Sequence, residues 1–175
     1  LHGQSKDALA KAQKGNWRYD VLEPGYKCNM TDIQAAIGLV ELARFQENID
    51  RRKAICLAYN EGFANEKWAL LPLLKDENRE TCYHLYQLRI AGVTEPQRDA
   101  IMQAIFDQDV SVNVHFQPLP LLTAYKNLGY KMTDYPEAWN KYSNEITLPV
   151  YFDLTDDQVQ IVISAVKNAV KQLLG

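Results

Sequence analysis

The chain has 175 residues, a formal net charge of −3, 23% charged residues and three cysteines. This length suits one globular domain or a part of a larger protein, and the small negative charge gives no sign of a nucleic-acid-binding surface. An odd number of cysteines without metal-ligand spacing favours a reducing, cytoplasmic setting, and no apolar run approaches the length of a membrane span.

The first 24 residues are mixed and polar, and they carry few structural signals. Residues 5–14 fit a short helix that ends at Gly15, and the segment from Gly15 to Gly25 is typical of a loop. We expect no signal peptide, because no short apolar stretch follows a basic start. Because the chain begins with Leu1 rather than methionine, we expect it to be a piece of a longer protein.

A helix is predicted to begin after Thr31, since Thr31 and Gln34 form a capping box. Two adjacent apolar stripes follow, made of Ile33, Ile37 and Val40, and of Ala35, Leu39 and Leu42. A helix that is apolar on two faces usually packs between two layers of structure. The helical pattern continues to Phe63, which is too long for one ordinary globular helix, so we expect one long bent helix or two helices in succession.

The pattern after residue 63 predicts an α/β fold. Apolar or alternating runs predict strands over residues 67–74, 83–90, 110–116 and 146–150. Helices are predicted after the capping boxes at Thr94 and Thr155 and over residues 136–144. In the last helix, the residues expected to face inward are Val159, Val162, Val166, Ala169 and Leu173. This order of elements indicates a small, largely antiparallel sheet covered by helices.

His115 is a candidate binding residue at the end of a predicted strand. It closes the polar face of residues 110–116 and precedes a proline-containing stretch that is stiff and unsuited to extend a sheet. Its functional interpretation is a hydrogen-bond donor to a substrate anion or phosphate. The alternative, which the pattern alone favours, is a structural histidine bonded to nearby backbone.

Lys27 and Asn29 lie at alternate positions just before the predicted start of the first long helix. Together with the free N–H groups of that helix start, they could hold a phosphate group. The alternative is an ordinary surface lysine and a turn-forming asparagine, and spacing alone does not decide between the two.

His84 shares a face of its predicted strand with three apolar residues, Tyr86, Leu88 and Ile90, so we expect it to be buried and hydrogen-bonded in the core. The sequence contains no GxGxxG, no P-loop, no GxSxG and no His/Cys set with metal spacing. Spacing alone therefore predicts an α/β domain with one candidate anion site.

Several linked stretches resemble a known family. They are the run GYKCNMTDIQAAIGLVELARFQENIDRRKAICLAYNEGF that begins at Gly25, the stretch WRYDVLEPGY that leads into it, and then YHLYQLRI, VNVHFQPLPLLTAY and EITLPVYFDLTDDQVQIVISAV. In this order they resemble the DegT/StrS family of nucleotide-sugar aminotransferases over essentially the whole chain. Several linked motifs are far more specific than any single match.

The resemblance implies the aspartate-aminotransferase fold, which is fold type I of the enzymes that use pyridoxal phosphate. This chain would be its C-terminal part. Residues 1–30 would end the large domain and form its active-site loop, residues 31–63 would be the connecting helix or helix pair, and residues 64–175 the small α/β domain. The active site of such enzymes lies at a homodimer interface, so a homodimer is implied.

The resemblance also implies a reaction, in which pyridoxal phosphate carries an amino group from glutamate to the keto-sugar of a nucleoside diphosphate sugar. Lys27 matches a position that approaches the cofactor phosphate, and Asn29 one that faces the sugar nucleotide. His115 matches a histidine near the phosphates or sugar of the substrate. Neither a nucleic acid nor a membrane is implied as a partner.

In such enzymes the lysine that forms the Schiff base precedes the region seen here, and none of the lysines in this chain lies in that motif. We therefore predict no catalytic residue in this chain, no metal site, and no activity for the fragment alone. Two alternatives remain open: a sugar dehydrase of the same family in which histidine replaces the lysine, and a non-catalytic dimerisation or regulatory domain.

Overall fold

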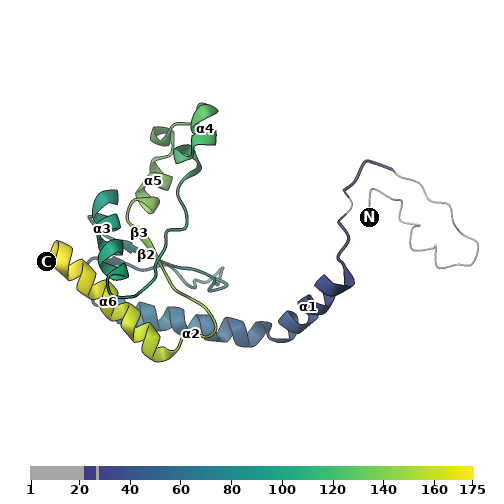
Figure 1. Ribbon diagram of the computed structural model, residues 1–175, viewed down its shortest axis with the longest axis horizontal. Coiled ribbons are helices and arrows are strands. Elements are labelled where there is room, and N and C mark those ends of the chain that lie inside the picture. The colour runs from purple at the N-terminus through teal and green to yellow at the C-terminus, as the bar shows by residue number, and fades with distance from the viewer. Residues whose placement is uncertain (1–21, 27) are drawn as a thin grey trace, which may run out of the picture. The chain divides into compact units, whose positions relative to one another are not determined.

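The structure of the protein is a computed structural model that describes residues 22–26 and 28–175 (Figure 1). It contains two compact units, residues 1–45 and residues 46–175, and each is described by itself. In chain order the elements are α1 (Asp32–Ala43), α2 (Phe45–Phe63), β1 (Ala69–Leu70), β2 (Tyr86–Ile90), α3 (Glu95–Phe106), η2 (Leu119–Leu121), α4 (Thr123–Asn127), η3 (Met132–Asp134), α5 (Pro136–Tyr142), β3 (Glu145–Leu148) and α6 (Asp156–Leu174). The helix predicted over residues 5–14 lies outside the described residues.

Helix α1 begins as predicted. The backbone N–H of Thr31 donates to Oε1 of Gln34 at 3.0 Å, and the N–H of Gln34 donates to Oγ1 of Thr31 at 3.3 Å. Helix α1 ends at Ala43 and α2 begins at Phe45, so the second of the two expected arrangements, two helices in succession, is confirmed. No residue of α1 is buried, and Ile33 is 75% exposed.

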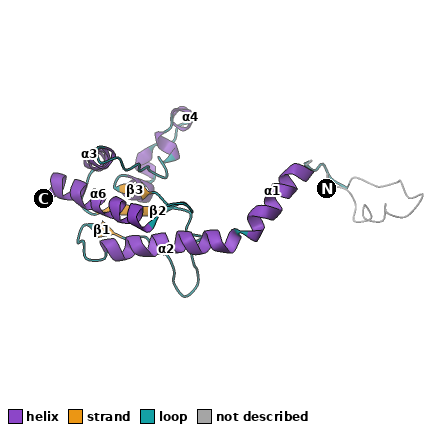
Figure 2. Cartoon of the chain, turned by 60° about the horizontal axis from the view of Figure 1, so that its bottom comes forward, coloured by secondary structure: helices purple, strands orange, loops and turns teal. Residues whose placement is uncertain are grey.

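The three strands form one antiparallel sheet in the order β1-β2-β3 (Figure 2). Strand β1 has only two residues, and Pro72, which has no N–H to give to a ladder, follows it closely. Strand β2 begins three residues later than predicted, because Tyr83 has a positive φ of 55° that breaks the extended backbone. Its pairing with β3 is in the register Leu88 to Ile146.

The prediction of a strand over residues 110–116 is wrong. Among the described residues this segment makes one bridge to the sheet, between Asn113 and Thr147, with N–H···O distances of 3.1 and 2.7 Å. The next N–H, that of Val114, donates to the Asn113 side chain at 2.8 Å, and the N–H of His115 donates to a side-chain carboxylate. Side chains thus take the hydrogen bonds that a strand would have given to its neighbour, and no fourth strand forms.

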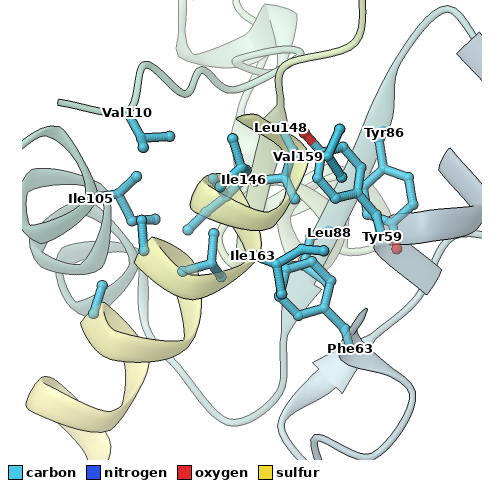
Figure 3. Packing of buried hydrophobic residues seen from close by; sticks show 14 of the residues in the cluster. Tyr59, Phe63, Tyr86, Leu88, Ile105, Val110, Ile146, Leu148, Val159 and Ile163 are labelled. Carbon is cyan, nitrogen blue, oxygen red and sulfur yellow. The ribbon is translucent and has the colours of Figure 1, made fainter. Parts of the chain in front are cut away.

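The core of residues 46–175 lies on the apolar face of the sheet, against α2, α3 and α6 (Figure 3). The rings of Tyr59 on α2 and Tyr86 on β2 lie 5.0 Å apart between centroids. Helices α2 and α6 approach closely at Gly62, since a Cβ built there would lie 2.7 Å from Cδ1 of Ile163. Only glycine fits that approach without a shift.

The capping boxes at the starts of α3 and α6 are confirmed. Four of the five inward positions predicted for α6 are buried, but Leu173 is 42% exposed because it lies in the last turn. The prediction of a buried His84 is wrong: it is exposed, since β2 begins only at Tyr86 and the alternation does not extend back to it. Within the part of the chain that the structure describes, no helix is both long and apolar enough to cross a membrane.

Candidate functional site

The second face of the sheet is polar and forms the floor of a candidate site. Gln87 lies opposite Thr147, and Arg89 lies opposite Glu145, in the register of β2 and β3. Because side chains alternate along a strand, these four residues share one face, and the apolar residues between them point into the core. The same alternation that builds the core therefore builds a polar surface behind it.

An open groove of about 580 Å³ lies on this polar face. Its floor includes Gln87, Arg89 and Glu145. Its walls are residues 71–73 after β1, residues 115, 116 and 118, and α5 residues 138, 141 and 142. The segment that carries α4 and α5 extends from the sheet on the side away from α2 and α6 (Figure 1). This segment connects residue 113 to β3, so the groove lies between the sheet and the connection that leads back into it.

His115 enters the groove on a backbone that side chains hold in place. Its N–H donates to Oε2 of Glu145 at 3.1 Å, and its carbonyl accepts from Nε2 of Gln87 at 2.6 Å. Its ring Nδ1 lies 3.1 Å from Oγ1 of Thr147, and that hydroxyl donates to Oε1 of Glu145. His115 is exposed, but its backbone and one ring nitrogen are fixed by three residues of the sheet.

Glu145 is the buried acid of the groove, with 4% of its surface exposed. Burial raises its pKa above 4.5, because it disfavours the charged form, while hydrogen bonds from Thr147 and from the N–H of His115 and the charge of Arg98 act in the opposite direction. The net result is a carboxyl group that holds its proton to a higher pH than an exposed glutamate does.

Arg98 lies behind Glu145 and is 2% exposed. Its Nη1 donates to the carbonyls of Tyr142 and Glu145 at 2.9 and 2.8 Å, and its Nε donates to Asp99 at 2.7 Å. One guanidinium thereby ties α3 to the junction between α5 and β3. This junction carries the wall and the floor of the groove, so Arg98 is a structural support for both.

The raised pKa of Glu145 predicts a pH-dependent cost to stability. Between pH 4.5 and the raised value the folded state binds more protons than the unfolded state, so the free energy of unfolding falls as pH rises through this window. The Glu145→Gln variant lacks this titration. Its free energy of unfolding minus that of the wild type should therefore increase as pH rises from about 4.5 to the raised pKa of Glu145, and should then level off.

Denaturant titrations of both proteins at matched pH values measure this difference. Glu80→Gln is the control, and its stability difference should change with pH in the opposite direction. Lys53 and Lys75 lower the pKa of Glu80 to about 2. The contribution of Glu80 to the free energy of unfolding is present above about pH 4.5 and is lost as pH falls towards 2. A Glu145→Gln difference that shrinks as pH rises would contradict the assignment.

The groove carries more positive than negative side chains. Two cationic side chains, Arg89 and Lys141, line it together with the single acid Glu145. Within the described residues neither Arg89 nor Lys141 has an ion-pair partner, so both cations are available to a ligand. Guanidinium and ammonium groups are strong donors to phosphate oxygens. The arrangement suits a ligand that is both anionic and rich in hydrogen-bonding groups.

The three predicted site residues lie in different parts of the chain. Lys27 lies outside the described residues. Asn29 is exposed just before α1, in residues 1–45, and His115 lines the groove in residues 46–175. Asn29 and His115 therefore belong to separate units of the structure, and a shared site for the two residues stays a prediction. Within the described ranges no group of three acids, histidines or cysteines could hold a metal ion.

The sequence interpretation missed the polar floor of the groove. Arg89, Glu145 and Thr147 were not among its candidates, although two signals point to them. Arg89 alternates with buried residues in YQLRI, and Thr147 does so in EITL. Lys141 carries no comparable signal, because it follows an irregular connection whose path the sequence does not predict.

The chain is similar to known proteins over nearly its whole length. The family model of the DegT/DnrJ/EryC1/StrS aminotransferases matches residues 1–167. Two curated relatives, the uncharacterized protein MJ1066 of Methanocaldococcus jannaschii and the spore coat polysaccharide biosynthesis protein SpsC of Bacillus subtilis, are each 39% identical over 98% of this chain. The chain spans 45% of the length of each.

Solved structures of aminotransferases share the fold. Spr1654 of Streptococcus pneumoniae, provisionally described as a sugar aminotransferase and solved in its PMP form, is 46% identical with a TM-score of 0.86, over 99% of this chain and 43% of its own. The aminotransferase TlmJ of Streptoalloteichus hindustanus is 26% identical with a TM-score of 0.76, over 91% and 42%. The α/β fold expected from the resemblance is confirmed. Because the family model covers nearly every residue, the chain belongs to the DegT/DnrJ/EryC1/StrS aminotransferase family.

Proposed function

We propose that the full-length protein is a pyridoxal-phosphate-dependent aminotransferase that moves an amino group from glutamate to the keto-sugar of a nucleoside diphosphate sugar. This chain is its C-terminal portion, inactive alone. The observation that carries the proposal is the match over residues 1–167, supported by 46% identity to a protein described as a sugar aminotransferase. The name of SpsC adds polysaccharide biosynthesis as the setting.

The groove is the proposed contact surface for the nucleotide sugar. His115 contacts the substrate at its sugar or phosphates, and Arg89 and Lys141 supply cations that can approach the diphosphate. Asn29 is proposed as a second substrate contact, and Lys27 as the residue that approaches the phosphate of the cofactor. The roles of His115, Arg89 and Lys141 are consistent with a groove that has two unpaired cations and one buried acid that is already hydrogen-bonded.

The described groove does not fit pyridoxal phosphate by itself. The cofactor needs a lysine to hold it covalently and an acid for its ring nitrogen. The groove has one acid, Glu145, and both of its oxygens already accept hydrogen bonds from Thr147 and the N–H of His115. Lys141 also lines the groove, but no lysine of this chain lies in the family's Schiff-base motif. We therefore assign the covalent attachment and the amino-transfer chemistry to residues in the rest of the full-length protein.

A homodimer in the cytoplasm is the proposed form of the full-length protein. Its proposed parts in this chain are the end of the large domain (1–30), the connecting helices (31–63) and the small domain (64–175). The exposed apolar side chains of α1 support a role in an interface, since Ile33, Leu39 and Leu42 are 69% exposed or more. So many exposed apolar side chains are unusual on a surface that contacts only water.

Spectroscopy of the full-length protein tests the reaction. The lysine-bound cofactor should lose its absorbance band when glutamate is added and regain it when a nucleotide-linked keto-sugar follows. A sugar dehydrase would instead form a deoxygenated sugar without net transfer of nitrogen from glutamate to that sugar, and a non-catalytic domain would show no band. Residues 1–175 alone should give no lysine adduct when treated with pyridoxal phosphate and borohydride; a specific adduct would contradict this assignment.

A further inference from the structure

A series of three side chains links the buried floor of the groove to the ring of His115. Glu145 and Thr147 are 4% and 5% exposed and lie on one face of β3. The Thr147 hydroxyl donates to Oε1 of Glu145, and its oxygen lies 3.1 Å from Nδ1 of His115. Oε2 of Glu145 accepts the N–H of His115 at 3.1 Å. One carboxyl group thus contacts His115 twice, through its backbone and through the hydroxyl.

The number of hydrogens decides which nitrogen of His115 carries its proton. A hydroxyl has one hydrogen, and a carboxylate can only accept, so the Thr147 hydrogen points to Glu145. The Thr147 oxygen can then only accept from Nδ1 of His115. A neutral His115 ring therefore has its proton on Nδ1 and its lone pair on Nε2.

The charged form of Glu145 has support in the structure. Two donors, the Thr147 hydroxyl and the N–H of His115, contact its two oxygens, and the charge of Arg98 also favours the carboxylate. These interactions oppose the effect of burial. Because the charged carboxylate can only accept, the Thr147 hydroxyl donates to Glu145 and accepts from His115.

We propose that Glu145 and Thr147 are positioning residues that hold His115 as its Nδ1–H tautomer, so that Nε2 accepts a hydrogen bond from a hydroxyl group of the sugar substrate. Among the described residues Nε2 has no hydrogen-bond partner, and His115 lines the groove. A phosphate oxygen can only accept, whereas a hydroxyl can donate to an unprotonated nitrogen. The identity of the ligand rests on the proposed function, but the tautomer does not.

Acylation by diethyl pyrocarbonate measures the lone pair on Nε2 without any substrate. The full-length protein is treated at about pH 8, where a histidine ring is neutral, and peptide mass spectrometry gives the rate at each histidine. Thr147→Val removes the hydroxyl, and free imidazole side chains prefer the proton on Nε2, so His115 should react several-fold more slowly. Thr147→Ser retains the hydroxyl and should react at the wild-type rate.

Glu145→Gln provides an independent variant of the same shape. Its amide oxygen can accept the N–H of His115 while its NH₂ donates to Thr147, which reverses the hydrogen bonds and moves the proton of His115 to Nε2. The rate at His115 should again fall several-fold, while His84, exposed and outside the groove, reacts equally in all variants. Unchanged rates at His115 in the Thr147→Val and Glu145→Gln variants would overturn the proposal, as would equal losses in Thr147→Ser and Thr147→Val. A failed aminotransfer assay would leave these rates unaffected and would count against the proposed function alone.

Discussion

Replacing Arg98 with methionine is expected to lower the free energy of unfolding by about 3 kcal/mol. The side chain is 2% exposed, and its Nη1 donates to two backbone carbonyls, that of Glu145, which is buried, and that of Tyr142, which is partly buried. Methionine fills a similar volume but donates no hydrogen bond, so both carbonyls lose their donor. A buried acceptor left in this state costs about 1–3 kcal/mol, which applies in full to the Glu145 carbonyl and in part to that of Tyr142.

Arg79→Met is the matched control for this prediction, because it removes an arginine that also pairs with an aspartate. The Arg79 side chain is 72% exposed, and its pair with Asp76 is a surface contact. Such pairs contribute about 0–1 kcal/mol. Denaturant titration of the two variants should therefore separate them clearly. Equal, small losses would mean that water or a shifted side chain replaces the guanidinium of Arg98.

The parts of the fold that the sequence predicts are those determined by local chemistry. The capping boxes at Thr31, Thr94 and Thr155 each start a helix where expected, because the same few residues supply both the signal and the hydrogen bonds. The buried stripe of α6 is also predictable, because its period matches a helix with one face on a core.

Residues 110–116 could not be predicted in this way. Their alternation is that of a strand, yet the N–H of His115 bonds to Glu145, and its carbonyl bonds to Gln87, which lie 30 and 28 residues away. Such bonds depend on which side chains the folded sheet brings near, and no window of the local sequence contains them. The same long-range dependence explains why the polar floor of the groove was missed.

For His115 the sequence offers two interpretations, a structural histidine and a binding residue. Spacing alone favours a structural histidine, and the structure does bond Nδ1 to Thr147 as a structural histidine would. The second ring nitrogen nevertheless remains available in a groove beside Arg89 and Lys141. The two interpretations are therefore compatible, because one nitrogen anchors the ring and the other can contact a ligand.

In the full-length enzyme, His115→Ala is expected to raise the KM for the nucleotide sugar about tenfold, since one hydrogen bond to a ligand contributes about 1.4 kcal/mol. The KM for glutamate should stay near the wild-type value, because the groove contacts are proposed for the sugar substrate. Steady-state kinetics with each substrate varied in turn measures both constants. His84→Ala removes an exposed histidine outside the groove and should leave both unchanged. Equal increases for the two substrates in His115→Ala would argue that the residue supports the fold of the active site and does not contact the sugar.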